Sequence, residues 1–304
     1  MEKRSFKERL KNEYIGQGFA GICGMLIILI TISIIIFIAS KGIKIFTEDG
    51  YSITQFLFKD NWQPSQEEPS FGALAFIAGS TLVSVGAIVL SAPIAVSLAI
   101  FTNVISKGFG SKVIKPCLEI LVGIPSVVYG WVGISVLVPF IKNNFGGMGY
   151  SLLSGILVLS LMVLPTIATL CIDAIKTIPQ DHIEASYGLG ATRWQTIYKV
   201  IVPGAKSGIL TGVVLGIARA FGEALAVQMV IGNTVKIPDG ILSSMSTLTS
   251  VITMDMANTV GGTMWNNALW SLALILLIIS FGFILLVRFI GKRSEERRVG
   301  KECR

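Results

Sequence analysis

The chain has 304 residues, of which 52% are hydrophobic and 14% are charged, and its mean hydropathy is +0.73. A soluble globular domain of this length does not need so much apolar surface, so the composition predicts an all-α, polytopic membrane protein. The net charge of +7 does not indicate nucleic-acid binding, because the lysines and arginines lie in short segments that flank apolar runs.

The cysteine and histidine content argues against several kinds of site. Cys23, Cys117 and Cys171 lie in or beside apolar runs, Cys303 lies in the tail, and none has metal-ligand spacing. We therefore expect no disulfide, no metal site and no cofactor. The single histidine, His182, leaves no histidine-based catalytic constellation, and the chain contains no phosphate-binding P-loop, so we do not expect an enzyme.

Apolar runs divide the chain into predicted membrane spans. Residues 1–16 are basic and are expected to form a cytoplasmic segment, and the uncharged run that follows is too long for a signal peptide. Residues 17–293 are expected to form one transmembrane domain. Its six spans are predicted at about 17–40, 71–105, 116–141, 150–172, 207–231 and 266–288.

The segments between spans also carry signals. Residues 41–69 have mixed charge and are expected to be external, with a short interfacial helix at Ile53–Phe58 and with Trp62 and Phe71 as anchors at the level of the lipid headgroups. A second external segment, residues 233–265, contains an apolar portion, Ile241–Met256, that could enter the membrane without crossing it.

Lysine and arginine counts set the predicted orientation. The segments expected inside hold five at the N-terminus, three after the second span, four in the loop 173–206 and at least three after the sixth span. The segments expected outside hold three, one and one. This asymmetry predicts that both termini are cytoplasmic.

The loop 173–206 is unusually long and polar for a connection between spans, and we call it the docking loop. Its central part, Glu184 to Pro203, reads EASYGLGATRWQTIYKVIVP. Asp181 and Glu184 suit the first turn of a short helix after Pro179, where carboxylates favour the positive end of the helix dipole.

A second short helix is predicted later in the docking loop, beyond Gly188 and Gly190 and ending before Pro203 and Gly204. Its basic and aromatic face has the composition of a protein interface and is expected to contain Arg193, Trp194, Ile197 and Tyr198. Composition alone equally permits an amphipathic loop that rests on the membrane surface.

Two ionisable residues, Arg219 and Glu223, lie within the predicted fifth span. Their spacing of four residues would place them on one face of a helix. One interpretation is a salt bridge that only fixes helix packing. The other is an anion station, in which the guanidinium binds oxyanion oxygens and Glu223 holds the arginine in place and offsets its charge.

The order Glu184, Ala185, Ser186, Gly190 and Pro203 resembles the loop by which permeases of bacterial ABC importers dock on their ATPase. Four stretches together resemble one family closely, the PstC-type permease subunits of phosphate-specific ABC importers. They are Lys115–Gly130, Leu189–Thr196, Ala218–Val230 and Ile231–Thr234.

This resemblance implies an ABC importer type I permease fold in a bacterial or archaeal plasma membrane. It implies four kinds of partner: a second, PstA-like permease, two copies of a PstB-like ATPase, an external PstS-like phosphate-binding protein, and membrane lipid. ATP-driven closure of the ATPases would alternate the access of a phosphate pathway through the docking loop. The residues expected to dock are Glu184, Ala185, Gly190, Arg193, Trp194 and Pro203.

Some alternatives remain open at this point. The permease could carry another oxyanion, such as sulfate or molybdate. An ion-coupled secondary transporter would need inverted repeats or paired broken helices, which are not seen in the sequence, and would leave the docking loop unexplained. Residues 294–304 continue no pattern and are expected to be a non-native tail.

Overall fold

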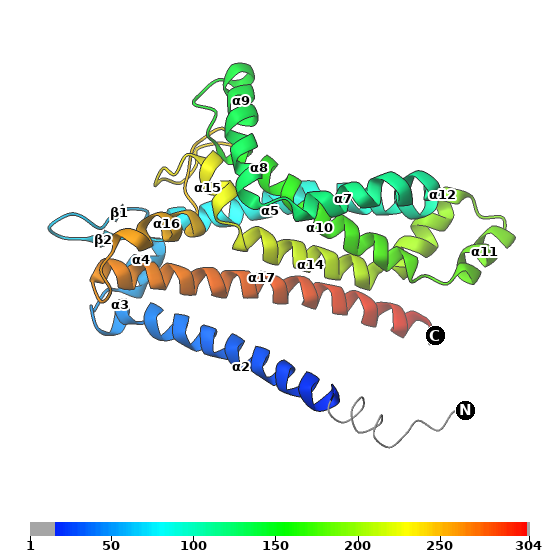
Figure 1. Ribbon diagram of the computed structural model, residues 1–304, viewed down its shortest axis with the longest axis horizontal. Helices are drawn as coiled ribbons and strands as arrows, with labels where there is room; N and C mark the ends of the chain where they lie inside the picture. The colour runs from blue at the N-terminus through cyan, green and yellow to red at the C-terminus, as the bar shows by residue number, and fades with distance from the viewer. Residues whose placement is uncertain (1–15, 303–304) are drawn as a thin grey trace.

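A computed structural model of the chain describes residues 16–302, of which 17, 107 and 290–302 are described by their backbone alone. The expected segment 1–16 therefore lies outside the described residues, apart from Gly16. The fold is helical almost throughout (Figure 1). The α-helices are α2 (Gly16–Gly42), α3 (Lys44–Thr47), α4 (Ile53–Phe58), α5 (Leu74–Ile100), α6 (Lys107–Phe109), α7 (Lys115–Gly123), α8 (Ser126–Val132), α9 (Val138–Phe145), α10 (Leu152–Lys176), α11 (Gln180–Gly188), α12 (Arg193–Thr196), α13 (Val202–Gly204), α14 (Lys206–Gly222), α15 (Leu225–Ile231), α16 (Leu248–Asp255) and α17 (Met264–Glu302).

Shorter elements complete the fold. A two-stranded antiparallel hairpin pairs Trp62 of β1 (Trp62–Gln63) with Phe71 of β2 (Ser70–Phe71). The remaining helical segments are the wider π-type turns η2 (Phe101–Ile105), η3 (Gly110–Ile114), η4 (Gly133–Leu137) and η5 (Ile197–Ile201) and the tighter 3₁₀ turn η6 (Met256–Asn258).

Within residues 16–302, five helices are long and apolar enough to cross a membrane, and a sixth crossing is obtained if one bent pair is counted as a single span. The five are Gly18–Thr47, Leu74–Ile105, Ser126–Phe145, Leu152–Lys176 and Met264–Phe289, and the bent pair joins Arg193–Gly204 to Lys206–Gly222 at 66°. The all-α, multi-span architecture predicted from the sequence is thereby confirmed. The orientation of the termini and the nature of the tail stay predictions.

Two of the predicted spans, 116–141 and 207–231, contain a break in the helix. The third breaks between α7 and α8 at Ile124, whose backbone is extended because the proline that follows disfavours helical geometry. The fifth breaks between α14 and α15, where Glu223 is extended. The sequence showed no sign of paired broken helices, but the structure contains these two breaks.

The two broken spans pack on each other through α8 and α15. A Cβ added at Gly130 would lie 2.6 Å from the sulfur of Met229, and one added at Gly133 would lie 2.7 Å from a methyl group of Val230. Glycine at these two positions therefore allows the close approach of the helices.

Helix α10 is the centre of the bundle and packs against both α5 and α14 (Figure 1). Its side chains Leu159, Ile167 and Ile172 are almost fully buried. Helix α2, in contrast, is exposed along most of its apolar length and lies beside α17, where lipid or a partner subunit would cover it.

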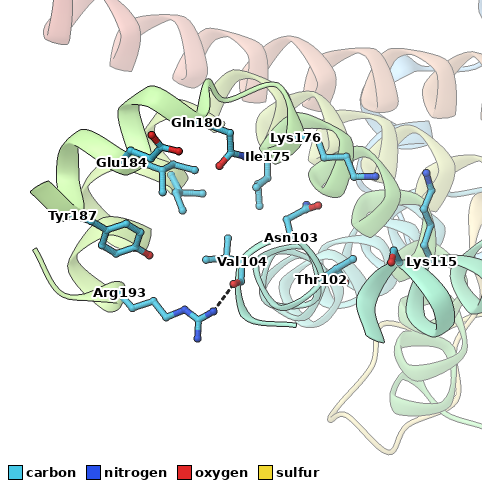
Figure 2. Close-up of a pocket in the computed structure, with 13 residues that line it drawn as sticks. Thr102, Asn103, Val104, Lys115, Ile175, Lys176, Gln180, Glu184, Tyr187 and Arg193 are labelled. Carbon is cyan, nitrogen blue, oxygen red and sulfur yellow. Dashed lines mark hydrogen bonds between the residues drawn. The ribbon is translucent and has the colours of Figure 1, made fainter. Parts of the chain in front are cut away.

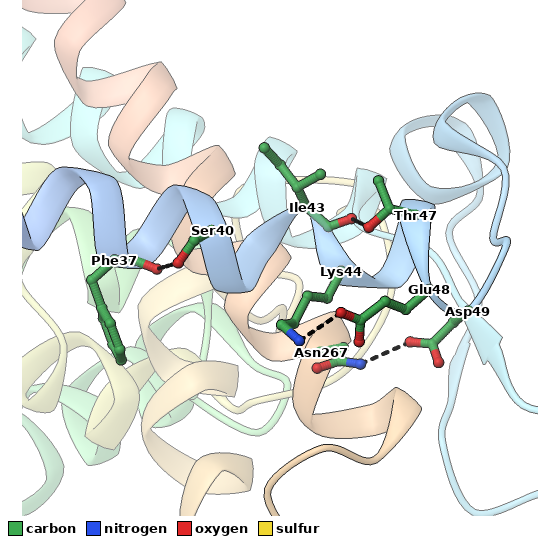
Figure 3. A network of polar contacts seen from close by, with 8 residues as sticks. All are labelled: Phe37, Ser40, Ile43, Lys44, Thr47, Glu48, Asp49 and Asn267. Atoms are coloured by element: carbon green, nitrogen blue, oxygen red, sulfur yellow. Dashed lines mark hydrogen bonds and ion pairs between the residues drawn. The ribbon is translucent and has the colours of Figure 1, made fainter.

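At the end of the molecule that carries the hairpin, a cluster of aromatic side chains packs against the ends of the helices. Helix α4 forms where the sequence predicted it, but Trp62 and Phe71 are buried in this cluster and are not headgroup anchors. Their rings lie 5.2 Å apart and edge to face. Beside the cluster, Asn267 of α17 donates a 2.9 Å hydrogen bond to Asp49, which fixes the end of α3 to α17 (Figure 3).

Candidate functional site

The docking loop contains the first short helix that the sequence predicted, α11. It begins directly after Pro179 and carries Asp181 in its first turn. Gly188 ends the helix, and Gly190 adopts a φ of +77°, a left-handed conformation that favours glycine. The interruption at these glycines turns the chain back toward the spans.

The second short helix, α12, begins with a reciprocal cap. The hydroxyl of Thr192 accepts from the backbone of Gln195, whose side chain accepts from the backbone of Thr192. The exposed fractions of Trp194 and Tyr198 are 71% and 69%, whereas that of Ile197 is 4%. The expectation that Ile197 belongs to the exposed face was therefore wrong, since it packs into the core.

Arg193 attaches the docking loop to the end of the second span. Its Nη2 donates hydrogen bonds of 2.7 Å to the carbonyl oxygen of Val104 and of 3.3 Å to that of Ile105 (Figure 2). These carbonyls end the helix α5–η2 and lack partners within it. On the same turn, Nδ2 of Asn103 donates a 2.9 Å hydrogen bond to the carbonyl oxygen of Ile172 in α10.

The other predicted docking residues lie on the same loop. Glu184 and Ala185 are exposed on α11, and Pro203 is partly buried where α13 meets α14. A 3.0 Å hydrogen bond between the hydroxyls of Ser186 and Thr196 holds α11 against α12. The loop is therefore a fixed unit with an exposed polar and aromatic surface.

Arg219 lies in the last turn of α14, a position where a cation is stabilised by the helix dipole. Its Nη1 donates a 2.7 Å hydrogen bond to the hydroxyl of Thr166 on α10. The guanidinium is thus held in a fixed direction between two spans, although it is only partly buried. Sequence reasoning missed Thr166, because a lone threonine in an apolar run carries no distinctive signal.

Glu223 does not hold Arg219, as the sequence had suggested. Because α14 ends at Gly222, the two residues do not share a helical face, and the ion pairs of the described residues do not include them. The carboxylate of Glu223 instead accepts a 3.1 Å hydrogen bond from the backbone amide of Ala226, in the first turn of α15. The backbone at the break therefore stabilises both charges.

Glu223 also borders a small hydroxyl-lined cavity of about 10 Å³, close to the space that one water molecule occupies. The hydroxyls come from two distant parts of the chain, the helix α5 and the start of α16, so no sequence motif could have revealed them. They belong to Ser80, Ser84, Thr247 and Thr249.

Comparison with known families and proteins gives a consistent result. Residues 92–296 match the model of the family described as "Binding-protein-dependent transport system inner membrane component". The chain is 47% identical over 292 residues to a probable ABC transporter permease protein, YqgH, of Bacillus subtilis, covering 96% of this chain and 94% of the relative. It is 32% identical over 262 residues to the phosphate transport system permease protein PstC of Mesorhizobium japonicum, covering 80% and 79%.

Solved structures show the same fold. A bacterial alginate ABC transporter in complex with its alginate-bound periplasmic protein matches with a TM-score of 0.62 at 14% identity, covering 96% of this chain and 98% of that one. The inward-facing MetNI methionine ABC transporter matches with a TM-score of 0.52 at 20% identity, covering 73% and 92%.

Proposed function

This chain belongs to the family of binding-protein-dependent transport system inner membrane components, and we propose that, as a permease subunit of an ABC importer, it carries inorganic phosphate. Permeases of this family are multi-pass inner-membrane proteins that work with an ATPase and a binding protein and are not themselves enzymes. The phosphate assignment is supported by the PstC relatives, which include that of Pasteurella multocida at 31% identity over 83% of this chain.

The observation that carries the proposal within the site is the hydrogen bond of Arg219 to Thr166. A guanidinium that is always charged and held between two spans offers a planar donor set to an oxyanion. Because its charge is compensated by the end of α14 and not by a carboxylate, it remains available to a passing anion. Weak, transient binding at this station suits transport better than a tight site.

The docking loop would transmit the work of the ATPase. Its exposed aromatic side chains, Trp194 and Tyr198, and the exposed Glu184 offer a contact surface, and Arg193 connects the loop to the second span. We assign this surface to a PstB-like ATPase, with both termini on the same, cytoplasmic side. A PstA-like permease and an external PstS-like binding protein complete the proposed importer.

Uptake of labelled phosphate by proteoliposomes that contain the complete importer tests this function. Wild type should take up phosphate, with weak competition from sulfate or molybdate. Arg219→Gln should abolish uptake while co-purification with the ATPase stays unchanged. Preferential uptake of sulfate or molybdate would assign the importer to that oxyanion, and normal phosphate uptake by the variant would reduce Arg219 to a packing role.

A further inference from the structure

A second polar cavity lies away from Arg219, at the docking-loop end of the molecule. Its volume is about 640 Å³, and it lies between α11, the end of α10 and the segment η2 to α7 (Figure 2). The docking residues Glu184 and Arg193 line one wall, and Lys115 and Lys176 lie on the opposite side (Figure 2). The docking assignment alone does not explain this second wall.

Neither lysine of the cavity forms an ion pair in the described part of the chain. The ion pairs there join Lys44 to Glu48 and Lys236 to Asp239. Figure 2 shows both side chains on the side of the cavity opposite Glu184. Two ammonium groups in a concave wall concentrate positive potential and favour an anion there.

Hydrogen-bonding groups accompany the charges. Thr102 lines the cavity and is only 4% exposed, and its hydroxyl has no hydrogen-bond partner. A buried hydroxyl without a partner is uncommon and indicates that a bound group forms the missing hydrogen bond. The side-chain amide of Gln180, at the start of α11, adds donors on the rim of the same cavity.

We propose that this cavity binds a phosphate group, carried either by free inorganic phosphate or by the headgroup of an anionic lipid. Lysine ammonium groups bind phosphate oxygens as point charges, and a phosphate has several oxygens for Lys115 and Lys176 to share. The proposal rests on the proposed function only in placing this end of the molecule in the cytoplasm. There it lies where lipid headgroups meet the aqueous phase.

Occupancy of the cavity would regulate the importer. A phosphate held by Lys115 of α7 and Lys176 of α10 would lie against the first residues of α11 and restrain the docking loop relative to the spans. Free phosphate arriving from the transport pathway would then slow its own import. A bound lipid would instead make coupling depend on membrane composition.

The test uses the two permeases with their ATPase, without the external binding protein and with Arg219→Gln, so that neither the binding protein nor the proposed pathway station contributes to phosphate binding. In nanodiscs of neutral phosphatidylcholine, added inorganic phosphate should raise the thermal unfolding midpoint saturably. Lys115→Gln and Lys176→Gln remove the charge but keep a polar side chain, and each should weaken the apparent affinity about tenfold. Lys112→Gln is the matched control, because this exposed lysine does not line the cavity.

A second arm replaces the soluble probe with nanodiscs of phosphatidylglycerol and no added phosphate. A rise of the midpoint in this arm alone, lost in the two lysine variants, supports the proposal with a lipid as the source. No saturable rise in either arm, or a rise that survives both lysine substitutions, overturns it.

The two permeases alone could bind phosphate and lose this binding when the ATPase is attached. That result would assign the cavity to the ATPase interface and would also overturn the proposal. Phosphate uptake by the single variant Arg219→Gln tests only the proposed function. The outcome for one proposal therefore does not decide the other.

Discussion

The guanidinium of Arg193 donates a 2.7 Å hydrogen bond to the carbonyl oxygen of Val104, which lies 89 residues earlier in the chain. The contact joins the docking loop to the end of the second span, where the last carbonyl groups of the helix have no hydrogen-bond donor within the helix. Because the neighbouring Asn103 is bonded to α10, the same turn connects the loop to two spans. We therefore expect movement of the docking loop to reach the spans through Arg193.

Substitution of Arg193 by alanine should separate ATP hydrolysis from transport. The variant loses a hydrogen bond from a charged donor, which contributes about 1.5–3 kcal/mol, so the loop can move without moving α5. Phosphate imported per ATP hydrolysed by the reconstituted importer should fall several-fold while ATPase activity persists. The measurement is the ratio of labelled phosphate uptake to phosphate released from ATP.

Arg193→Lys is the matched variant for this experiment. A lysine keeps the charge but has no planar fork that can reach the carbonyls of both Val104 and Ile105, so coupling should be restored only in part. An unchanged transport ratio in Arg193→Ala would show that the loop transmits force by another route.

Gly190 should be sensitive to substitution for a reason that concerns the backbone alone. An added Cβ would meet nothing within 4 Å, but the φ of +77° costs a residue other than glycine about 1–2 kcal/mol. Gly190→Ala should therefore weaken attachment of the ATPase by about 5–30-fold. The amount of ATPase retained on the purified permease at graded ATPase concentrations measures this affinity.

Gly188→Ala provides the control two residues away. Its added Cβ also meets nothing within 4 Å, but its φ is not positive, so we expect no loss of affinity. If both substitutions weaken ATPase binding equally, the loss of affinity comes from a change in the surface of the loop and not from the positive φ at Gly190.

Much of this fold follows from sequence patterns whose physical cause is local. Apolar runs give the spans, and Pro179, together with Asp181 in the first turn, marks the start of α11. The break at Ile124 also has a local signal, the proline that follows it, and the predicted third span should have been divided there.

Other features depend on contacts that leave no local pattern. The break at Glu223 lies in a run without proline and is set by the packing of α15 on α8 and by the carboxylate that caps Ala226. The partner of Arg193 is a backbone carbonyl, a group that every residue carries. Trp62 was predicted to be an interfacial anchor because it lies in a polar segment of the sequence. Its burial depends on aromatic residues that are distant in the chain, and no local pattern shows them.

Asp255, at the end of α16, should make stability depend on pH. Burial raises the pKa of its carboxyl group, and the indole N–H groups of Trp62 and Trp265, which approach it without completing hydrogen bonds, offset part of the rise. The folded pKa therefore lies above the value of about 3.9 expected in an unfolded chain. Stability should fall as the pH rises from that value through the folded pKa, and at neutral pH the full cost of the buried charge remains.

Asp255→Asn should remove this cost and with it the pH dependence in that window. We expect a higher thermal unfolding midpoint at pH 7 and a flat profile between pH 4 and the folded pKa, measured on the purified protein at about 0.5 pH intervals. Asp239→Asn, which affects only an exposed pair with Lys236, is the control. A lower midpoint for Asp255→Asn at pH 7 would mean that its interactions with the indoles outweigh its burial.

Thr166→Val tests whether the direction of the Arg219 side chain matters, separately from its charge. Valine has nearly the same shape but cannot accept the 2.7 Å hydrogen bond from Nη1, so the guanidinium loses its fixed position between α10 and α14. With about 1.5–3 kcal/mol of positioning lost, phosphate uptake should fall by about tenfold or more. Uptake is measured with labelled phosphate in proteoliposomes, normalised to the amount of assembled importer.

Thr169→Val is the matched control on the same helix. The Thr169 hydroxyl bonds only to the carbonyl oxygens of Pro165 and Thr166 in its own helix, so its loss should leave Arg219 and uptake unchanged. If Thr166→Val transports as well as Thr169→Val does, the position of the guanidinium is not limiting, and Arg219 would act through its charge alone. In that case Arg219→Lys should also transport normally, because the point charge is retained.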